Sequence, residues 1–493
     1  MSKKIRFLSA LLASLMLAGA LTACGTSGDD TTQTTDAYED GVNTDDNLPD
    51  DLDYANQEIT IISRDREGWT RGEISVDSLT GDPVNDAVFE RNKAVESRLN
   101  VTINSILDKD EDSYAVATKV NQAIQAGSDD YDIMAAAAYT VYPGSISGNY
   151  ADLADTLYID LSKPWWTQGY NDAVSYEGMQ FSATGSVLLS TYRFAFVTVF
   201  NKALFTDANQ PYLYETVKSG DWTLDKQISL VPLLYRDDGD PKSFRNDVFG
   251  LATSKRISVD PYWSSCKLDI IKKNADGELE LVLDREKLHT VTEKLLNLYY
   301  NSATLTYSGG AGDPEQGDIR TKFVESHASM ATLRIMALEN ESMRSMEDEY
   351  GVVPMPKYDK AQENYYTLLH DQFTVIAVPT TVTDDKLDMV SAVLEAMSSS
   401  SYKVLKPVYY EDTLRTKLAS DPDTSMMMEI IVDGIYIDLA ILDPGFGVHH
   451  ALRDMILKNS NTTASRFQSI SQSAQKKIDE LVKSLDRLAA ERE

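Results

Sequence analysis

The sequence predicts an α/β protein built from more than one lobe, and three observations support this. The chain has 493 residues, which is more than a single domain of ~100–200 residues needs. Its side chains are 42% apolar and 9% aromatic, enough to fill more than one core. From Glu58 onward, short runs of β-branched residues alternate with amphipathic segments of helical length. This alternation favours parallel strands with helices on both faces of a sheet.

The first elements can be placed in order along the chain. Residues 58–63 form a short β-branched strand. A helix follows from Pro83 to Asn100, because Asp82 is a good N-cap and proline suits the first helical position. A strand at 101–107, a helix at 114–126 and a strand at 131–137 complete this region. Ligands of parallel sheets bind beyond the carboxyl ends of the strands, so the residues that follow each strand are candidates for function.

Residues 1–24 predict export from the cell. Three basic residues are followed by 14 mostly apolar residues at 7–20. That run is shorter than the ~20 residues that cross a bilayer, so it fits a secretory signal better than a transmembrane helix. Leu-Thr-Ala-Cys at 21–24, followed by Gly25, resembles the lipobox of bacterial lipoproteins. The resemblance implies that Cys24 is lipidated and anchors the protein to the cell membrane, facing outward. An ordinary signal peptide with an incidental cysteine is the alternative.

Residues 25–56 predict a disordered tether. They contain ten acids, no Lys or Arg, and many Thr, Gly and Asn. Such a segment buries too little apolar surface to fold, and its like charges extend it. We therefore expect this tether to hold the folded part, which begins at residue 57, off the membrane.

Charge and cysteine content exclude several classes of protein. The chain has 46 Lys and Arg against 77 Asp and Glu, a net charge of −31 that repels the phosphates of nucleic acid. The only two cysteines, Cys24 and Cys266, support neither a disulfide framework nor a structural zinc site. Lipidation of Cys24 leaves Cys266 alone, and we expect it to be a buried apolar side chain.

Familiar catalytic motifs are missing from the sequence. None of the five histidines lies in a His-Glu-x-x-His spacing, and no Gly-x-Ser-x-Gly nucleophile elbow is present. Gly309-Gly-Ala-Gly312 lacks the Lys-Ser/Thr of a phosphate loop. We therefore expect no enzyme activity, no cofactor and no metal. Two alternatives stay open: a cell-surface glycoside hydrolase, whose two carboxylates cannot be chosen by inspection, and a surface adhesin, although we find no internal repeat.

Several motifs in order along the chain resemble one family of proteins. They are FNKALF at 200–205, GDWTLDK at 220–226, DVFGL at 247–251, GVVPMPK at 351–357 and VYYEDTL at 408–414, preceded by a first helix at 83–100. Together they resemble the extracellular solute-binding proteins of bacterial carbohydrate ABC transporters (family 1). The resemblance covers essentially the whole folded part.

The resemblance implies a type II clamshell like that of periplasmic binding proteins, with two discontinuous lobes. Lobe 1 would comprise residues 57–193 and 372–410, and lobe 2 residues 194–371 and 411–493. Hinge crossovers would lie near 192–195 and 371–374. The implied function is capture of a carbohydrate, with an oligosaccharide as the favoured class, by closure of the lobes on it and delivery to the transporter's permease subunits. A monomer at the bacterial cell surface or in the periplasm is expected.

Candidate ligand-binding residues follow from their positions after strands and at a crossover. Sugars present aliphatic patches ringed by hydroxyls, so aromatic platforms and planar hydrogen-bond forks suit them. Each aromatic candidate has core packing as its alternative, and each arginine a structural ion pair. The candidates are Arg64, Trp69, Tyr139, Tyr142, Arg193, Asp260, Tyr262, Trp263, Arg334 and Tyr436.

Other features are expected to be structural. Trp165 and Trp166 resemble a sugar platform but fit packing on lobe 1 better, and Trp222 precedes a helix as a packing anchor. In the last helix, the apolar residues Phe467, Ile470, Ala474, Ile478, Leu481, Leu485 and Leu488 form one face. That face predicts docking on the protein's own lobes, mainly the second, with a coiled coil as the alternative. Asp237-Asp-Gly-Asp240 resembles the start of a calcium loop, but Pro241 follows at once, so bound calcium stays an open alternative.

Overall fold

The computed structural model describes residues 45–240, 246–308, 314–414, 422–448 and 450–492. The predicted signal peptide, Cys24 and residues 25–44 of the predicted tether lie outside the described residues. The rest of that tether is packed: Asp46 and Leu48 are buried, and Arg98 of α2 (Pro83–Leu99) lies 2.7 Å from an Asp46 carboxylate oxygen. Packing therefore begins before residue 57, because one leucine and one paired carboxylate give contacts that the acidic composition of the segment does not reveal.

The first sheet has the strand order β11-β3-β1-β2. β1 (Gln57–Arg64) pairs in parallel with β2 (Val101–Asp108) and with β3 (Ile133–Ala137), and β11 (Thr374–Ala377) pairs antiparallel with β3. This confirms the predicted parallel pairing. The carboxyl ends of β1, β2 and β3 and the first residue of β11 therefore lie at one edge of the sheet.

Helices connect these strands as the sequence predicts. The Asp82 side chain caps α2 by accepting hydrogen bonds from the backbone N–H groups of Val84 and Asn85. α3 (Ala115–Ala126) leads from β2 to β3, and α4 (Ala138–Ser147) follows β3 directly. Because α3 and α4 both start where a strand has just ended, their first residues lie near the edge formed by the strands' carboxyl ends.

The second sheet is mixed and has the order β10-β4-β9-β5-β8. Its strands are β4 (Phe196–Asn201), β5 (Leu251–Ser254), β8 (Thr304–Tyr307), β9 (Met330–Arg334) and β10 (Tyr350–Pro354), and a separate hairpin joins β6 (Ile271–Lys273) to β7 (Leu279–Leu281). β4 pairs antiparallel with β9, so that Phe196 at the start of one faces Arg334 at the end of the other. β5 runs parallel to β9, and its carboxyl end therefore lies on the same side as Arg334.

Two extended segments run side by side between the sheets. Ala195 pairs antiparallel with Leu369, the Phe196 N–H donates to the Leu368 carbonyl, and the His370 N–H donates to the Phe194 carbonyl at 3.0 Å. One segment leads into β4 and the other leads back to β11. The first sheet thus takes its fourth strand from a part of the chain that comes after the whole second sheet.

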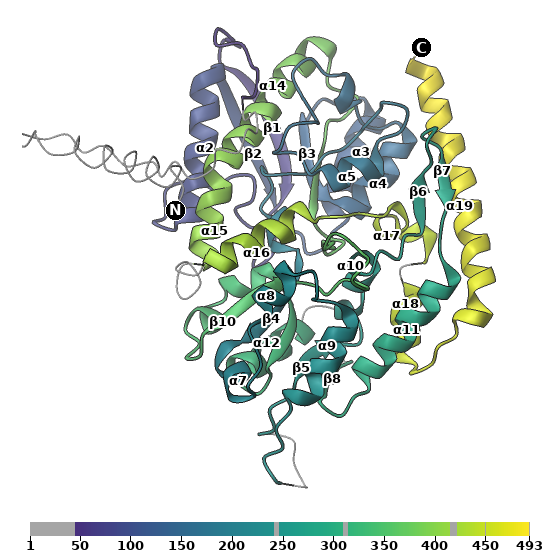
Figure 1. Ribbon diagram of the computed structural model, residues 1–493. Helices are drawn as coiled ribbons and strands as arrows, with labels where there is room; N and C mark the ends of the chain where they lie inside the picture. The colour runs from purple at the N-terminus through teal and green to yellow at the C-terminus, as the bar shows by residue number, and fades with distance from the viewer. Residues whose placement is uncertain (1–44, 241–245, 309–313, 415–421, 449, 493) are drawn as a thin grey trace, which may run out of the picture. The chain divides into compact units, whose positions relative to one another are not determined.

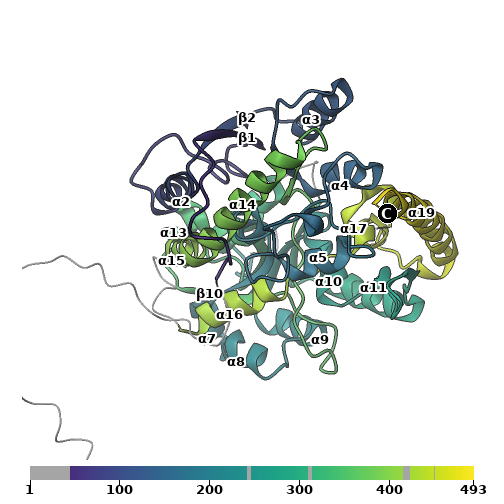
Figure 2. The ribbon, with the colours of Figure 1, turned by 90° about the horizontal axis from the view of Figure 1, so that it is seen from above.

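Helices pack around both sheets (Figures 1 and 2). The long helix α19 contacts α11 and the β6–β7 hairpin, which lie in the predicted second lobe, and also α4, which follows β3 of the first sheet. Leu488 packs on Gly148, and the Tyr176 hydroxyl donates to Asp486 at 2.8 Å. A helix of 30 residues is ~45 Å long, so it reaches α4 as well as the elements of the predicted second lobe. The helices not yet given are α5 (Gln168–Val174), α6 (Ser190–Arg193), α7 (Lys202–Asp207), α8 (Leu213–Lys218), α9 (Leu224–Leu230), α10 (Pro261–Ser265), α11 (Arg285–Tyr299), α12 (Pro314–Val324), α13 (Glu341–Arg344), α14 (Asp384–Ser400), α15 (Lys406–Leu414), α16 (Pro422–Asp433), α17 (Leu439–Leu442), α18 (His450–Leu457) and α19 (Thr463–Arg492).

Residues predicted to be structural lie in the core. Trp165 and Trp166 are 1% and 2% exposed, and the Trp166 indole donates to Glu395 of α14 at 3.0 Å. Trp222 is fully buried, and its indole donates to the Pro354 carbonyl. Cys266 is a buried free thiol. None of the helices in the described part of the chain is long and apolar enough to cross a membrane.

Candidate functional site

The candidate site lies where the edges of the two sheets meet the crossover segments. Arg64 ends β1 of the first sheet, and Arg334 ends β9 of the second. The Arg64 guanidinium donates to the Gln372 carbonyl at 2.6 Å, and Arg334 lies at the register position of Phe196, directly after the other crossover. Side chains from both sheets therefore converge on the segment 370–372.

Trp69 is the aromatic centre of this site. It lies in the turn after β1, and two guanidinium carbons lie near its ring centroid: that of Arg66 at 5.1 Å and that of Arg334 at 4.9 Å. Phe194 and His370 meet the indole edge-on, each with a centroid separation of 5.5 Å. Cation–π contacts of this kind contribute ~0.5–2 kcal/mol each. Trp69 therefore joins a loop of the first sheet to the end of a strand in the second.

Arginines of the first sheet are held by the crossover. Arg64 is 4% exposed; its burial lowers the pKa of the guanidinium to about 10, which keeps it charged at neutral pH, and the charge of Glu73 opposes that shift. Arg66 donates to the Gln372 side-chain oxygen at 2.9 Å and pairs with Glu111 at 3.0 Å. The guanidinium groups of Arg64 and Arg66 are held in place before any ligand arrives, which lowers the entropy lost on binding.

His370 packs against Trp69, which lines a cavity, and together with Asp371 it belongs to the part of the site that we call the recess. Asp371 exposes 52% of its side chain, and burial raises the pKa of its carboxyl, against the opposing charges of Arg453 and Arg334. Burial, followed by the charges of Arg334 and Arg453, holds the pKa of His370 well below its ordinary value, so this imidazole is neutral.

Asp260 comes from the second sheet's side of the recess. It stands at the start of α10, and its carboxylate contacts the Arg453 guanidinium of α18 through two nitrogens, with 19% and 21% of the two side chains exposed. Burial raises the pKa of Asp260 to about 6, although Arg453 lowers it in part. The pair ties α18, near the end of the chain, to the rim of the site.

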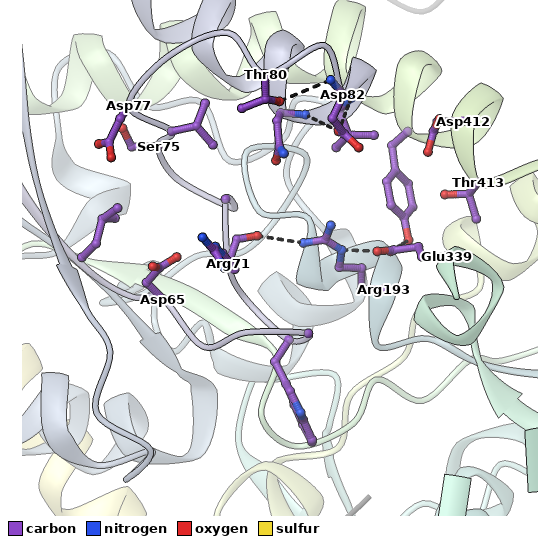
Figure 3. A pocket seen from close by; sticks show the side chains of 18 of the residues that line it. Asp65, Arg71, Ser75, Asp77, Thr80, Asp82, Arg193, Glu339, Asp412 and Thr413 are labelled. Carbon is purple, nitrogen blue, oxygen red and sulfur yellow. Dashed lines mark hydrogen bonds and ion pairs between the residues drawn. The ribbon is translucent and has the colours of Figure 1, made fainter. Parts of the chain in front are cut away.

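Tyr139 and Arg193 complete the predicted residues found at the site. Tyr139 is partly exposed, shares a hydrogen bond with Ser113, and meets the ring of Tyr114 edge-on at 5.4 Å. Arg193 forms the structural pair that we gave as its alternative: its Nε donates to Glu339 at 2.9 Å, and Nη1 lies 3.4 Å from the Arg71 carbonyl. Figure 3 shows Arg193 between these two partners.

Two neighbouring cavities open beside these residues. The larger, of about 530 Å³, is lined by the turn 65–85, by Arg193 and by Tyr409 of α15 (Figure 3). The smaller, of about 360 Å³, is lined by Arg334, Met336 and Arg320. Gly68 and Glu339 line both, so the two cavities adjoin. Space for a ligand therefore lies on either side of the Trp69 turn.

Three predicted residues belong instead to the core. Tyr142, Tyr262 and Trp263 are 3%, 0% and 2% exposed and pack in the main apolar cluster. The Tyr262 hydroxyl donates to the Gln227 side chain at 2.9 Å. Tyr142 lies on the buried side of α4, and Tyr262 and Trp263 lie in α10, all of whose residues are buried. None of the three lines the cavities beside Trp69, whereas Arg334, although only 2% exposed, lines the smaller one.

Tyr436 lies at a different cavity. That cavity, of about 460 Å³, is bounded by the β6–β7 hairpin and the end of α5. The Tyr436 ring meets Tyr366 edge-on at 5.3 Å, and the Lys267 ammonium lies 3.1 Å from its centroid. The structure does not bring Tyr436 into contact with the residues around Trp69.

Sequence reasoning missed four residues of the recess: Arg66, His370, Asp371 and Arg453. Arg66 lies two residues after a predicted site residue, so a wider window after β1 would have included it. Asp371 was placed at a crossover but was not proposed to bind. Arg453 reaches Asp260 across 193 residues of sequence, and no local pattern signals that contact.

The acidic segment near residue 237 brings three carboxylates together. Asp237, Asp238 and Asp247 each offer an oxygen within 4.8 Å of the others. Asp247 already accepts hydrogen bonds from the Tyr235 hydroxyl at 2.6 Å and from the Asp238 N–H at 3.1 Å. Acidic side chains often gather in this way without a metal, so bound calcium stays an open alternative, as in the sequence analysis.

The fold is that of the substrate-binding proteins of ABC transporters, as the sequence resemblance predicted. No protein-family model matches the chain, and a search of curated proteins also finds no match. Solved structures do match. An ABC substrate-binding protein from Listeria monocytogenes, in complex with cycloalternan, aligns with a TM-score of 0.52 and 15% identity over 87% of this chain and 99% of its own.

Two further structures share the fold. The maltose/maltodextrin-binding domain MalE from Bdellovibrio bacteriovorus, bound to maltotriose, gives a TM-score of 0.51 and 13% identity over 86% of this chain and 100% of its own. UspC of M. tuberculosis gives a TM-score of 0.56 and 14% identity over 84% of this chain and 99% of its own. At these identities the likeness establishes the two-lobed α/β fold.

Proposed function

We propose that this protein is the solute-binding component of an ABC importer, which captures a carbohydrate by closing two lobes on it and delivers it to the permease. Lobe 1 would comprise residues 57–193 and 372–410, and lobe 2 residues 194–371 and 411–493. The protein acts as a monomer at the outer face of the membrane, held by lipid on Cys24, and it binds its ligand without converting it.

The arrangement around Trp69 carries this proposal. An aromatic ring from the first sheet lies against a guanidinium that ends a strand of the second sheet, 4.9 Å away, directly beside the crossover segments. A sugar offers an aliphatic face to the ring and hydroxyls to the arginine forks. A ligand that touches both Trp69 and Arg334 contacts both lobes, so it stabilises the arrangement in which the two lie together.

The ligands named for the fold neighbours support the choice of a carbohydrate. One neighbour was solved with cycloalternan and another with maltotriose. Both are oligosaccharides, and an oligosaccharide also suits a site that continues from Trp69 into two adjoining cavities. The charges of the site are largely paired, which fits hydroxyl recognition by oriented ion pairs.

A ligand screen tests the proposal. Purified protein is heated with mono- and oligosaccharides of glucose and mannose; a ligand at 100 times its Kd is expected to add ~2.7 kcal/mol to the free energy of unfolding. Each ligand found is then recovered and analysed by mass spectrometry. We expect it to return intact. Cleaved sugar would favour a glycoside hydrolase, and a panel without any stabilising sugar would reject carbohydrate capture.

Arg334→Lys provides the matched variant for this screen. Lysine keeps the charge but loses the planar fork, so we expect the affinity for the sugar to fall at least about 10-fold, a difference of ~1.4 kcal/mol. Arg236→Lys is the control, because Arg236 is 62% exposed and pairs with Asp207 away from the site. Equal affinity of both variants and wild type would place the sugar elsewhere.

The membrane anchor is tested separately. We expect Cys24→Ala to release the protein from the membrane fraction into the medium, because stable anchoring needs lipid on that residue. A variant that stays with the membrane would show that Cys24 is not the anchor, without affecting the ligand screen.

A further inference from the structure

Tyr114 is an exposed aromatic residue at the ligand-facing edge of the first sheet. Its side chain is 49% exposed, and it stands directly before α3, where the chain leaves the end of β2. Single exposed tyrosines are common on protein surfaces. The neighbours of Tyr114 distinguish it from the others.

Tyr114 continues a line of side chains that begins at the crossover. Its ring meets Tyr139 edge-on, with centroids 5.4 Å apart and planes at 75°. Tyr139 lies beside the crossover segment, because the N–H of Ala138, the residue before it, donates to the Phe373 carbonyl at 2.9 Å. Tyr139 therefore neighbours both Tyr114 and the segment that carries Asp371, and Tyr114 extends this line by one ring.

The position of Tyr114 is fixed by its backbone. Its N–H donates to Asp112 Oδ1 at 3.0 Å, and its carbonyl accepts from the Thr118 N–H at 2.9 Å. Glu111 of the same loop pairs with Arg66, which also lies against Trp69. The loop that carries Tyr114 is thus tied to the centre of the site, and its ring needs little further ordering to receive a ligand.

Trp69 and Tyr114 present two separate aromatic platforms. Trp69 is surrounded by Arg66, Arg334, Phe194 and His370, and Tyr114 by Tyr139. No ring contact joins the two groups within the described residues, and Tyr139 is the member of the Tyr114 group that stands beside the crossover segment. One hexose that stacks on Trp69 leaves Tyr114 uncovered.

We propose that Tyr114 is an outer sugar-stacking platform that sets the preferred length of the ligand. This inference rests on the proposed function. The sugar unit on Trp69 is held by Arg66 and Arg334, following units pass Asp371 and Tyr139, and an outer unit stacks on Tyr114. The ligand is therefore an extended oligosaccharide of several units, and Tyr114 contributes only to the binding of the longer members of a series.

The test measures affinity against ligand length. Wild type, Tyr114→Ala and Tyr114→Phe are titrated by calorimetry with glucose, maltose, maltotriose and maltopentaose, and with mannose and the corresponding manno-oligosaccharides. In wild type, affinity should rise with length. Tyr114→Ala should lower the affinity for the longest ligand about 2- to 13-fold, the range for one aromatic stacking contact, and leave the shortest bound ligand unchanged. Tyr114→Phe keeps the ring and should match wild type.

Tyr212→Ala is the matched control. Tyr212 is 41% exposed and also precedes a helix, α8, but its ring lies near Phe200 at the opposite end of β4 from the crossover. It should not change affinity at any length. Thermal unfolding of all variants checks that each is folded; Tyr114 is half exposed, so little change is expected.

The outcomes separate the two proposals. If wild type binds none of these saccharides, carbohydrate capture fails and the inference fails with it. If wild type binds but affinity does not depend on length, or if Tyr114→Ala binds the longest ligand as tightly as wild type, only the outer platform is rejected. An equal loss for short and long ligands would place Tyr114 at the centre of the site and would overturn its role in selecting length.

Discussion

The edges of the two sheets that adjoin the crossover differ in the burial of their aromatic residues. At the first sheet, Trp69 and Tyr139 stay partly exposed beside the crossover. At the second sheet, Tyr262 and Trp263 occupy the same kind of position after a strand but are buried in the core. Trp69 is in a turn and Tyr139 is the second residue of helix α4, whereas Tyr262 and Trp263 form part of the short helix α10, all of whose residues are buried. A turn or the start of a helix can leave a ring partly exposed, whereas a helix buried along its whole length cannot.

The largest effect expected from this contrast concerns Trp263. Trp263→Ala removes a side chain that is 2% exposed and should lower the free energy of unfolding by about 3–5 kcal/mol, through lost burial and the cavity left behind. Chemical denaturation measures this change. Any loss of sugar affinity should follow from unfolding and disappear at low temperature, where the variant is folded. A folded variant with wild-type stability and weakened binding would restore Trp263 to the site.

Trp69→Ala should act in the opposite sense. Its ring is a central contact between the lobes and the proposed platform for a sugar, so affinity should fall by about 2 kcal/mol, roughly 30-fold. The free energy of unfolding should change less than in Trp263→Ala, because the indole is only partly buried. Calorimetric titration with the sugar found in the screen measures the affinity of each variant, and denaturation measures its stability. Trp69→Ala should lose mainly affinity, and Trp263→Ala mainly stability. Two variants with the same profile would break the comparison between the edges.

How far the sequence predicts this contrast depends on the range of the contacts involved. The strands of the first sheet, the Asp82 cap and the burial of Trp222 and Cys266 follow from local patterns and were predicted. Position after a strand placed Arg64, Trp69 and Tyr139 at this edge, but it did not tell whether an aromatic side chain after a strand stays partly exposed or packs into the core. That choice depends on packing against residues far along the chain.

The recess itself was the least predictable part. Arg453 of α18 meets Asp260, and Gln372 in the second crossover meets Arg64 and Arg66. Each contact joins residues more than 190 positions apart, and composition or spacing carries no trace of it. The resemblance to a family gave the clamshell, whereas the particular side chains that fill its centre come from tertiary contacts.

The buried carboxyl of Glu395 is expected to make the free energy of unfolding depend on pH. Burial raises the pKa of Glu395, beside Trp166 in the core of the first sheet, to about 8. Between pH ~4.5 and ~8 the folded chain holds a proton that the unfolded chain releases, so the free energy of unfolding should fall as pH rises, by at most ~1.4 kcal/mol per unit, and level off above pH ~8. Glu395→Gln should remove this slope.

Urea denaturation at several pH values, followed by tryptophan fluorescence, measures the effect of Glu395. Glu67→Gln is the control, because Glu67 is 85% exposed and its carboxyl is solvated in both states. The slopes of the free energy of unfolding against pH should differ most between wild type and Glu395→Gln at about pH 6, midway between ~4.5 and ~8, and the two proteins should bind sugar equally. If wild type and Glu395→Gln had the same pH dependence of stability, Glu395 would be ionised in the folded protein.

The smallest expected effect compares two phenols, one from each edge. Tyr139→Phe removes a hydroxyl that bonds to Ser113 beside the recess, where water can replace it, so the free energy of unfolding should change by less than about 1 kcal/mol. Tyr262→Phe removes a hydroxyl that donates to Gln227 in the core at 2.9 Å and leaves the amide oxygen without that donor, which should cost about 1–3 kcal/mol. Neither ring is lost, so packing is unchanged, and the two variants differ only in access to water. Denaturation of the pair therefore tests whether the first edge is solvated and the second is core: equal losses would mean that Tyr139 is as enclosed as Tyr262, and that the first sheet presents no open aromatic edge to a ligand.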